Sequence, residues 1–252
     1  MIPLKVLHRN DKGPALLLIH GFPLDQRLWQ NQIDRLPFAL RLIVPDLRGC
    51  GGSPLPPGPC AIDDYGRDLL SLMNELKAER FYVAGHSMGG YIVFSMLRQA
   101  PARILGAAFV SSRALPDTDE GRKARLATAE RAEREGPGFL ADAMPAKAVG
   151  NAPPPGVTET LRTIMSQAQP AGVAAASRAM AARVDSTPGL SQIQCPTLVL
   201  AGRQDKFIPA AESEAMAKGI PGCRLVWCET SGHVPMLEEP DLVTRELAAL
   251  VK

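Results

Sequence analysis

The sequence predicts an α/β fold in which a mostly parallel central sheet carries helices on both faces. Two observations lead to this prediction. Apolar, strand-like runs alternate along the chain with segments of helical periodicity, and parallel strands joined in this way must be covered on both faces by right-handed crossovers. One long stretch in the second half contains no convincing strand, which indicates a helical insertion. At 252 residues, the chain is one large domain or a core with an insertion.

The elements of the core follow from local patterns. Residues 6–8 and 15–20 are expected to form a hairpin around the turn Asn10–Gly13. Apolar side chains at spacings of three and four predict a helix face made of Ile62, Tyr65, Leu69, Met73 and Leu76. Further strands are expected at 42–44, 81–84, 105–110, 197–201 and 225–227. A helix is expected at about 90–99. A terminal helix is expected from about Asp241, with Leu242, Leu247 and Leu250 facing the core.

Residues 117–190 are predicted to form the helical insertion, a lid that divides the core into residues 1–116 and 191–252. A charged helix is expected from Glu120 to Glu135, closed by Gly136. Two further helix faces are expected, one with Leu161, Ile164, Met165 and Ala168 and one with Val173, Ala176, Met180 and Val184. Met144, Met165 and Met180 are expected to pack between helices, and together they would form an adaptable apolar ceiling over a site at the end of the sheet.

The pattern Gly85-His86-Ser87-Met88-Gly89 lies between a buried apolar run and a helix, and it indicates a serine nucleophile. In a nucleophile elbow the serine adopts a strained backbone, and residues bulkier than glycine two positions away would clash with the chain. The alternative is a glycine-rich loop on a doubly wound sheet with no catalytic role. The strand–turn–helix context favours Ser87 as the nucleophile.

A serine hydroxyl needs a base at neutral pH, and the chain offers four histidines. His233 follows the last predicted strand and therefore shares the carboxyl edge of the sheet with Ser87, which makes it the expected base. His86 is adjacent to Ser87, but the elbow sends the two side chains in different directions. His8 lies on the N-terminal hairpin, and His20 is expected to brace the loop that follows it.

The base needs an acid that orients it, expected between the serine and the histidine in chain order. Asp205 follows the strand at 197–201 and stands on the same edge of the sheet, so it is the expected acid. The alternative is Asp117. The strand before Asp117 ends in Ser111-Ser112 and therefore carries no carboxylate at its tip.

An oxyanion needs preorganised N–H donors, and two backbone groups are expected to supply them. One is the N–H of Met88, at the start of the helix after the nucleophile. The other is the N–H of Phe22, in the loop after an early strand, where Pro23 has no N–H to offer. The substrate pocket is expected between the elbow and the insertion, lined by Phe22, Met88, Phe139 and Val234.

Composition argues against several other classes of protein. A formal net charge of +2, with mixed signs along the chain, gives no argument for a nucleic-acid or membrane partner. No signal peptide or run of ~20 apolar residues is visible. The five cysteines lack metal-ligand spacing and are expected to be reduced thiols of a cytoplasmic protein, with a Cys223–Cys228 disulfide as the alternative. The glycine-rich segment 44–53 lacks the spacing of a nucleotide-binding loop. We therefore expect no cofactor and no metal, in a monomer or small homo-oligomer.

Together these motifs resemble the α/β-hydrolase superfamily, and within it the Thermogutta-type bacterial carboxylesterases and the 3-oxoadipate enol-lactonase-like hydrolases. The resemblance covers nearly the whole chain, through segments 20–25, 45–49, 87–91, 134–139, 172–176 and 185–187, Gly202 with Asp205, and Gly232 with His233. It implies an α/β-hydrolase fold, a triad of Ser87, Asp205 and His233, and oxyanion donors at Phe22 and Met88. Ser111-Ser112 is a departure, since a relative is expected to have an aspartate at that strand end.

The expected function is that of a serine carboxylesterase that hydrolyses small, short-acyl esters through an acyl-enzyme intermediate. A lactonase or enol-lactonase would use the same triad, and a perhydrolase side activity would use peroxide in place of water. A small-molecule receptor on the same fold is the alternative from another class. Haloalkane dehalogenases and epoxide hydrolases are disfavoured, because the resemblance would then require an aspartate at position 87.

Overall fold

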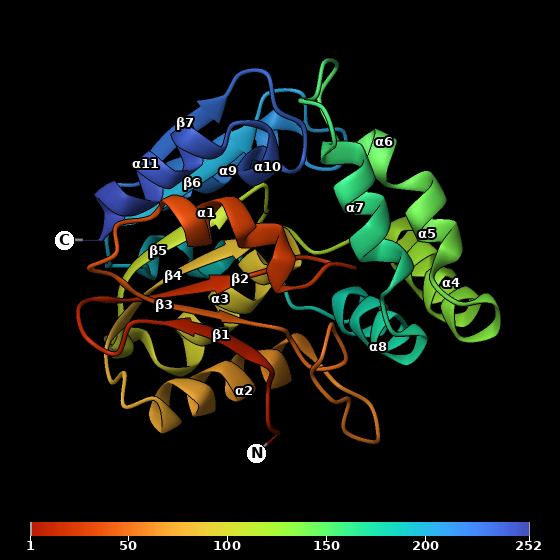
Figure 1. The fold of residues 1–252 in the computed structure, drawn as a ribbon, viewed down its shortest axis with the longest axis horizontal. Coiled ribbons are helices and arrows are strands. Elements are labelled where there is room, and N and C mark those ends of the chain that lie inside the picture. Colours follow the sequence, from red (N-terminus) through yellow and green to blue (C-terminus); the bar gives the residue numbers. More distant parts are fainter. Residues whose placement is uncertain (1, 252) are drawn as a thin grey trace.

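The computed structural model describes residues 2–251, and these contain one seven-stranded sheet in the order β1-β3-β2-β4-β5-β6-β7 (Figure 1). The β1 and β3 strands are antiparallel, and the other neighbouring pairs are parallel. The α/β fold with a mostly parallel sheet is therefore confirmed. The strands are β1 (Val6–Arg9), β2 (Ala15–Ile19), β3 (Arg41–Pro45), β4 (Phe81–His86), β5 (Ile104–Val110), β6 (Thr197–Gly202) and β7 (Arg224–Cys228).

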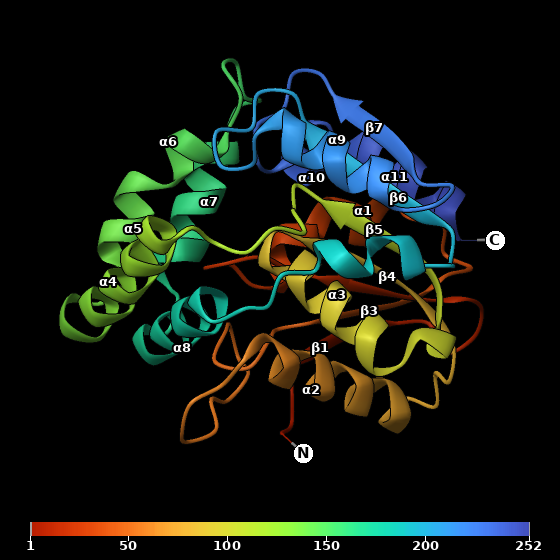
Figure 2. The ribbon, with the colours of Figure 1, turned by 180° about the vertical axis from the view of Figure 1, so that it is seen from behind.

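Helices cover both faces of this sheet (Figures 1 and 2). Successive side chains of a strand point to opposite faces, so a strand that is apolar throughout contributes to two cores. In β2, Leu17 and Ile19 join the core under α2 and α3, whereas Leu16 and Leu18 join the core under α1 and α11. The helices of the core are α1 (Gln30–Arg35), α2 (Ile62–Glu75), α3 (Met88–Gln99), α9 (Ala210–Gly219), α10 (Pro235–Glu238) and α11 (Pro240–Leu250).

The expected N-terminal hairpin is wrong, because β1 pairs with β3 and not with β2. Val6 lies opposite Pro45, and β3 then runs parallel to β2 on its other side. The burial of the strands explains this order. All five residues of β2 are buried, as an interior strand requires, whereas β1 is half exposed and suits the edge of the sheet. Strand pairing here is a long-range property that the local turn signal does not decide.

The segment between β5 and β6 forms five α-helices, which Figures 1 and 2 show gathered beside the sheet on one side of the molecule. As expected, α4 ends at Gly136, whose φ of 78° is left-handed. The face expected to include Val184 is wrong at its end: α8 stops at Ala181, and Val184 is 56% exposed. The helices are α4 (Asp119–Glu135), α5 (Gly138–Ala143), α6 (Pro145–Ala148), α7 (Val157–Ser166) and α8 (Pro170–Ala181).

Three further features concern residues 2–251. No helix in this range has both the length and the apolar character needed to cross a membrane. All five cysteines are free thiols, so Cys223 and Cys228 form no disulfide. Within the same range, no three side chains of the histidine, cysteine, aspartate or glutamate type gather in a way that could hold a metal ion.

Candidate active site

Ser87 lies in the sharp turn between β4 and α3, with φ 50° and ψ −111°. A non-glycine residue in this region is strained, which is the backbone expected of a nucleophile elbow. The flanking glycines allow the turn to close: a Cβ at Gly85 would lie 2.3 Å from the carbonyl oxygen of Gly89. The turn is also held from β5, because Val110 accepts the N–H of Ser87 at 2.9 Å.

Asp205 and His233 follow the neighbouring parallel strands β6 and β7, and their side chains meet. His233 Nδ1 lies 2.8 Å from Asp205 Oδ2, and the two side chains are 9% and 2% exposed. The other carboxylate oxygen accepts the backbone N–H groups of Phe207 and Ile208 at 2.8 and 3.0 Å. Because an ionised carboxylate only accepts, Nδ1 carries the proton and Nε2 of His233 is left as the acceptor. That is the tautomer a general base requires.

His86 brings the elbow and the His233 loop together. Its Nε2–H donates to the carbonyl oxygen of His233 at 2.8 Å, and the two ring centroids are 4.9 Å apart. Burial holds the pKa of His86 well below its ordinary value, and the charge of His233 acts in the same direction. His86 is therefore a neutral donor. Since Ser87 is the next residue, this contact ties the elbow to the loop that carries the candidate base.

The two expected oxyanion donors lie after the adjacent strands β2 and β4. Met88 is the first residue of α3, and the N–H at that position has no partner within its helix. Phe22 follows Gly21 in a loop that His20 braces: His20 Nδ1 donates to the carbonyl of Gly21 at 2.9 Å, while Nε2 accepts the N–H of Leu47 at 3.0 Å. Burial lowers the pKa of His20, in keeping with a neutral ring that makes both bonds.

A small cavity of about 10 Å³ lies against the expected oxyanion donors. That is close to the ~10–15 Å³ that a single water requires. Of the residues expected to line the substrate pocket, Phe22 and Met88 line this cavity, whereas Phe139 and Val234 do not. Phe139 packs against the small apolar cluster of Ala132, Leu140 and Val173, with Arg131 over its ring, and Val234 is buried in the core under α11. The lining residues are Phe22, Pro23, Leu24, Asp25, Gly49, Cys50, Gly51, Met88, Ile164, Ala168, Gly172, Val173 and Ala176.

One wall of this cavity is a direct contact between two backbones. A Cβ at Gly172, in α8, would lie 1.7 Å from the carbonyl oxygen of Gly49 in the loop after β3. No side chain fits between them, so only glycine at position 172 lets the helix approach so closely. The insertion is thus seated on the core beside Met88, and the cavity has little room to widen on this side.

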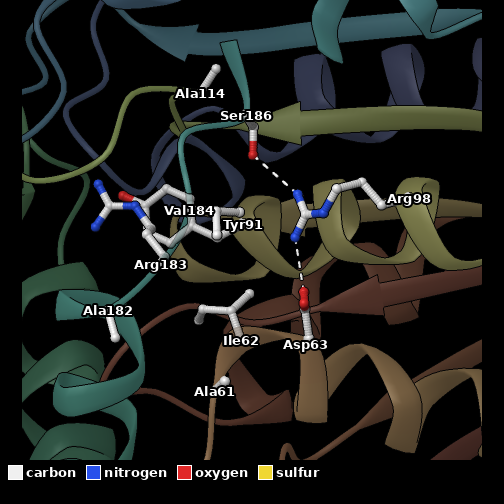
Figure 3. A pocket seen from close by; sticks show the side chains of 10 residues that line it. All are labelled: Ala61, Ile62, Asp63, Tyr91, Arg98, Ala114, Ala182, Arg183, Val184 and Ser186. Atoms are coloured by element: carbon white, nitrogen blue, oxygen red, sulfur yellow. Dashed lines mark hydrogen bonds and ion pairs between the residues drawn. The ribbon is translucent and has the colours of Figure 1, made fainter. Parts of the chain in front are cut away.

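A second pocket, of about 50 Å³, lies where residues 182–186 return from α8 to the core (Figure 3). The Arg98 guanidinium crosses it between Asp63 at 2.8 Å and the hydroxyl of Ser186 at 3.3 Å (Figure 3). On the other side, Arg183 stacks over the ring of Tyr91. The three candidate catalytic residues, Ser87, Asp205 and His233, line neither this pocket nor the small cavity beside Phe22 and Met88.

Asp117, the alternative acid, is bound to arginines. Its carboxylate lies 2.6 Å from Arg113, 3.1 Å from Arg125 and 2.7 Å from Arg183. Burial alone would raise the pKa of Asp117, but the hydrogen bond from Arg183 and the charges of Arg125 and Arg183 outweigh it and hold that pKa well below its usual range. These contacts tie the start of the insertion to its end. No histidine takes part in them among the described residues.

Two contacts at the site involve residues that the sequence did not single out for this role. The hydroxyl of Ser112 donates to the carbonyl of Ser87 at 2.9 Å and so braces the elbow from β5. Phe207 stands edge-on to the His233 ring, with centroids 5.0 Å apart. The position of Ser112 at the end of the strand beside β4 is a signal that could have been used. Phe207 follows Asp205 by two residues, but nothing in the sequence indicates its orientation.

The model of the alpha/beta hydrolase family matches residues 16–246. A thermophilic esterase from Thermogutta terrifontis, solved with malate bound, is 39% identical to this chain, and its structure matches with a TM-score of 0.96. The match covers 100% of this chain and 95% of the esterase chain. The enol-lactonase from Burkholderia xenovorans is 26% identical with a TM-score of 0.90, over 99% of this chain and 96% of its own. By sequence, 3-oxoadipate enol-lactonase 2 of Acinetobacter baylyi is 26% identical over 95% of this chain and 89% of its own length.

Proposed function

The chain belongs to the α/β hydrolase family, and we propose that it is a serine carboxylesterase for small, short-acyl esters. The observation that carries the proposal is the Asp205–His233 hydrogen bond of 2.8 Å, formed beside a strained serine elbow. Similarity to an esterase along the whole chain supports the same reaction class.

In the proposed reaction, Ser87 Oγ attacks the ester carbonyl carbon while His233 Nε2 takes its proton. Asp205 holds the Nδ1–H and stabilises the imidazolium that forms. The N–H groups of Phe22 and Met88 bind the oxyanion, and a donor of this kind is worth about 2.7–4 kcal/mol of the barrier. The alcohol leaves with the proton from His233. Water then attacks the acyl-enzyme, with His233 again as base, and releases the acid and Ser87.

The preference for short acyl groups rests on the size of the cavity. Each methylene of the acyl chain that is buried contributes about 0.8 kcal/mol to binding until the cavity is full. Further atoms are then overpacked, which costs binding free energy. The cavity beside Phe22 and Met88 is small, and the backbone contact between Gly49 and Gly172 bounds it, so a long acyl chain would have to move α8 to extend on this side. Turnover should therefore be fastest on short chains.

A lactonase with the same triad is the second candidate, supported by the similarity to two enol-lactonases. The charge of the cavity bears on which esters or lactones would fit. Among the described residues, its lining includes no lysine or arginine, and its one acidic residue, Asp25, is paired with Arg27 at 2.7 Å. A substrate that carries its own carboxylate would find no counter-charge there, which favours neutral acyl groups and neutral lactones.

The test is a series of p-nitrophenyl esters from acetate to laurate, measured beside neutral and carboxylate-bearing lactones. We expect kcat/KM to peak at the short esters and Ser87→Ala to abolish the turnover. A peak at long chains would refute the short-acyl assignment, and higher kcat/KM on lactones would replace esterase by lactonase. A single slow turnover on every substrate would indicate a receptor.

A further inference from the structure

Residues 148–151, at the end of α6 and the start of its connection to α7, lie directly against the loop that carries His233. The backbone N–H of His233 donates to the carbonyl of Ala148 at 2.7 Å. A Cβ at Gly232 would lie 2.5 Å from the carbonyl carbon of Val149. The two backbones are therefore in contact, and the position of the proposed base depends on a loop of the helical insertion.

Glu238 joins these same two loops. It belongs to α10, and its side chain is buried beneath them. One carboxylate oxygen accepts the N–H of Gly150 at 2.7 Å, and the other accepts the N–H of Gly232 at 2.8 Å. Each oxygen thus serves a different loop. Both residues must be glycines, because a Cβ at Gly150 would lie 2.2 Å from the carbonyl oxygen of Thr230 and one at Gly232 would lie 2.5 Å from the carbonyl carbon of Val149.

The electrostatics of Glu238 argue against a role in stability alone. Burial raises the pKa of this carboxyl, the charge of Glu239 adds to the effect, and the N–H bonds from Gly150 and Gly232 only partly oppose it. A carboxyl whose pKa is raised on folding makes the folded state less stable as the pH rises above its ordinary range. A buried carboxylate held at this cost is better explained by the geometry that its two oxygens impose.

We propose that Glu238 is a positioning residue for His233: its two oxygens lock the loop of the base to residues 148–151 of the insertion. The inference rests on the proposed function, since it assigns the orientation of the base in that reaction. It means that seating of the insertion and alignment of His233 are one event, because a shift of residues 148–151 carries the His233 loop with it.

The chain offers a matched pair of variants, Glu238→Gln and Glu239→Gln. A glutamine has one acceptor oxygen, so Glu238→Gln keeps one bond and turns an NH₂ group toward the other N–H. Glu239 uses a single oxygen for its bonds with the N–H and hydroxyl of Thr230 and the hydroxyl of Ser231. Glu239→Gln therefore keeps its acceptor and is the control for loss of a charge at the neighbouring position.

The kinetic readout is kcat per active site, titrated with an organophosphate, so that a loss of folded protein is not counted as a loss of rate. For Glu238→Gln we expect kcat to fall about 10- to 100-fold with little change in KM, the size of effect that a misaligned catalytic group produces. Glu239→Gln should leave both unchanged. Gly150→Ala should lower kcat by itself and add little in the Glu238→Gln background, because both changes break the same junction. An unchanged kcat in Glu238→Gln, or an equal loss in Glu239→Gln, would overturn the proposal.

A second readout does not depend on turnover. The proton between His233 Nδ1 and Asp205 should give a downfield proton NMR signal, shifted or broadened in Glu238→Gln and unchanged in Glu239→Gln. If the wild type hydrolysed no ester, the proposed function would fail, yet this comparison would still decide the role of Glu238. An identical signal in wild type, Glu238→Gln and Glu239→Gln would contradict the positioning role of Glu238.

Discussion

Two buried aspartates near the same edge of the sheet, Asp205 and Asp117, have opposite surroundings. Asp205 accepts one imidazole N–H and two backbone N–H groups, whereas Asp117 is bound by three guanidinium groups. A histidine ring exchanges its proton near neutral pH, but a guanidinium keeps its charge. The bonding partner, more than the burial, therefore distinguishes a carboxylate that can orient a base from one that holds two chain segments together.

The largest expected effect is that of Asp205→Asn. The amide oxygen can still accept from Phe207 and Ile208, while the NH₂ group faces His233 Nδ1 and forces the wrong tautomer. We expect kcat to fall on the order of 10³–10⁴-fold. The measurement is steady-state kinetics on a short ester, with thermal unfolding as the check that the fold is kept. A kcat within tenfold of wild type would mean that the comparison assigns the wrong aspartate.

Asp117→Asn is the reciprocal change. Removing one partner of a buried ion pair costs about 3–5 kcal/mol of the free energy of unfolding, because the arginines left behind are uncompensated. We expect a loss of that size in urea unfolding, with kcat per active site nearly unchanged. If kcat fell as far as in Asp205→Asn while stability held, Asp117 would be the acid of the triad.

The pH dependence of stability sharpens the same contrast. Since the folded pKa of Asp117 is depressed, its contribution is complete above the ordinary pKa of an aspartate, about 3.9, and is lost as the pH falls through the folded value. The free energy of unfolding of wild type should therefore exceed that of Asp117→Asn by a constant amount above about pH 5, and this difference should decrease below about pH 4. Urea titrations at several pH values measure it. If the difference in unfolding free energy persisted at the lowest pH, the charge of Asp117 would not be its cause.

The smallest expected effect concerns how the insertion is seated. In Gly172→Ala the new methyl group meets the backbone of Gly49, and neither backbone can give way without moving α8. We expect a loss of about 1–3 kcal/mol in unfolding free energy and a lower kcat/KM on short esters. The control is Gly138→Ala at the start of α5, where a Cβ meets nothing within 4 Å. If the two variants had the same unfolding free energy and the same kcat/KM, the close contact between Gly172 and Gly49 would not determine how the insertion is seated.

Sequence reasoning reached much of this picture because the main signals are local. The elbow, the loop of Asp205 and the loop of His233 each follow a recognisable strand, and parallel strands bring their carboxyl ends to one edge. The pairing of β1 could not be found in this way, since the nearest turn signal says nothing about a strand thirty residues away. The end of α8 was also missed, because Arg183 leaves the helical pattern to reach Asp117.

The parts of the site made by backbone contacts are the least visible in a sequence. The bond from His233 to Ala148 joins two peptide groups, and no side-chain pattern marks such a pair. The volume of the cavity likewise depends on how closely Gly172 approaches Gly49, which only the packed structure reveals. Positions that follow from a side chain in a local motif were predictable, and contacts that follow from packing were not.

The most direct test of the central claim, that Ser87 is a nucleophile activated by His233 and Asp205, is covalent labelling with a diethyl phosphoryl ester followed by peptide mass spectrometry. Wild type should gain one phosphoryl group, on the peptide that contains Ser87, and lose esterase activity in parallel with labelling. Asp205→Asn should label far more slowly, Asp117→Asn at nearly the wild-type rate, and Ser87→Ala not at all. An adduct on another residue, or full activity in a fully labelled enzyme, would contradict the account.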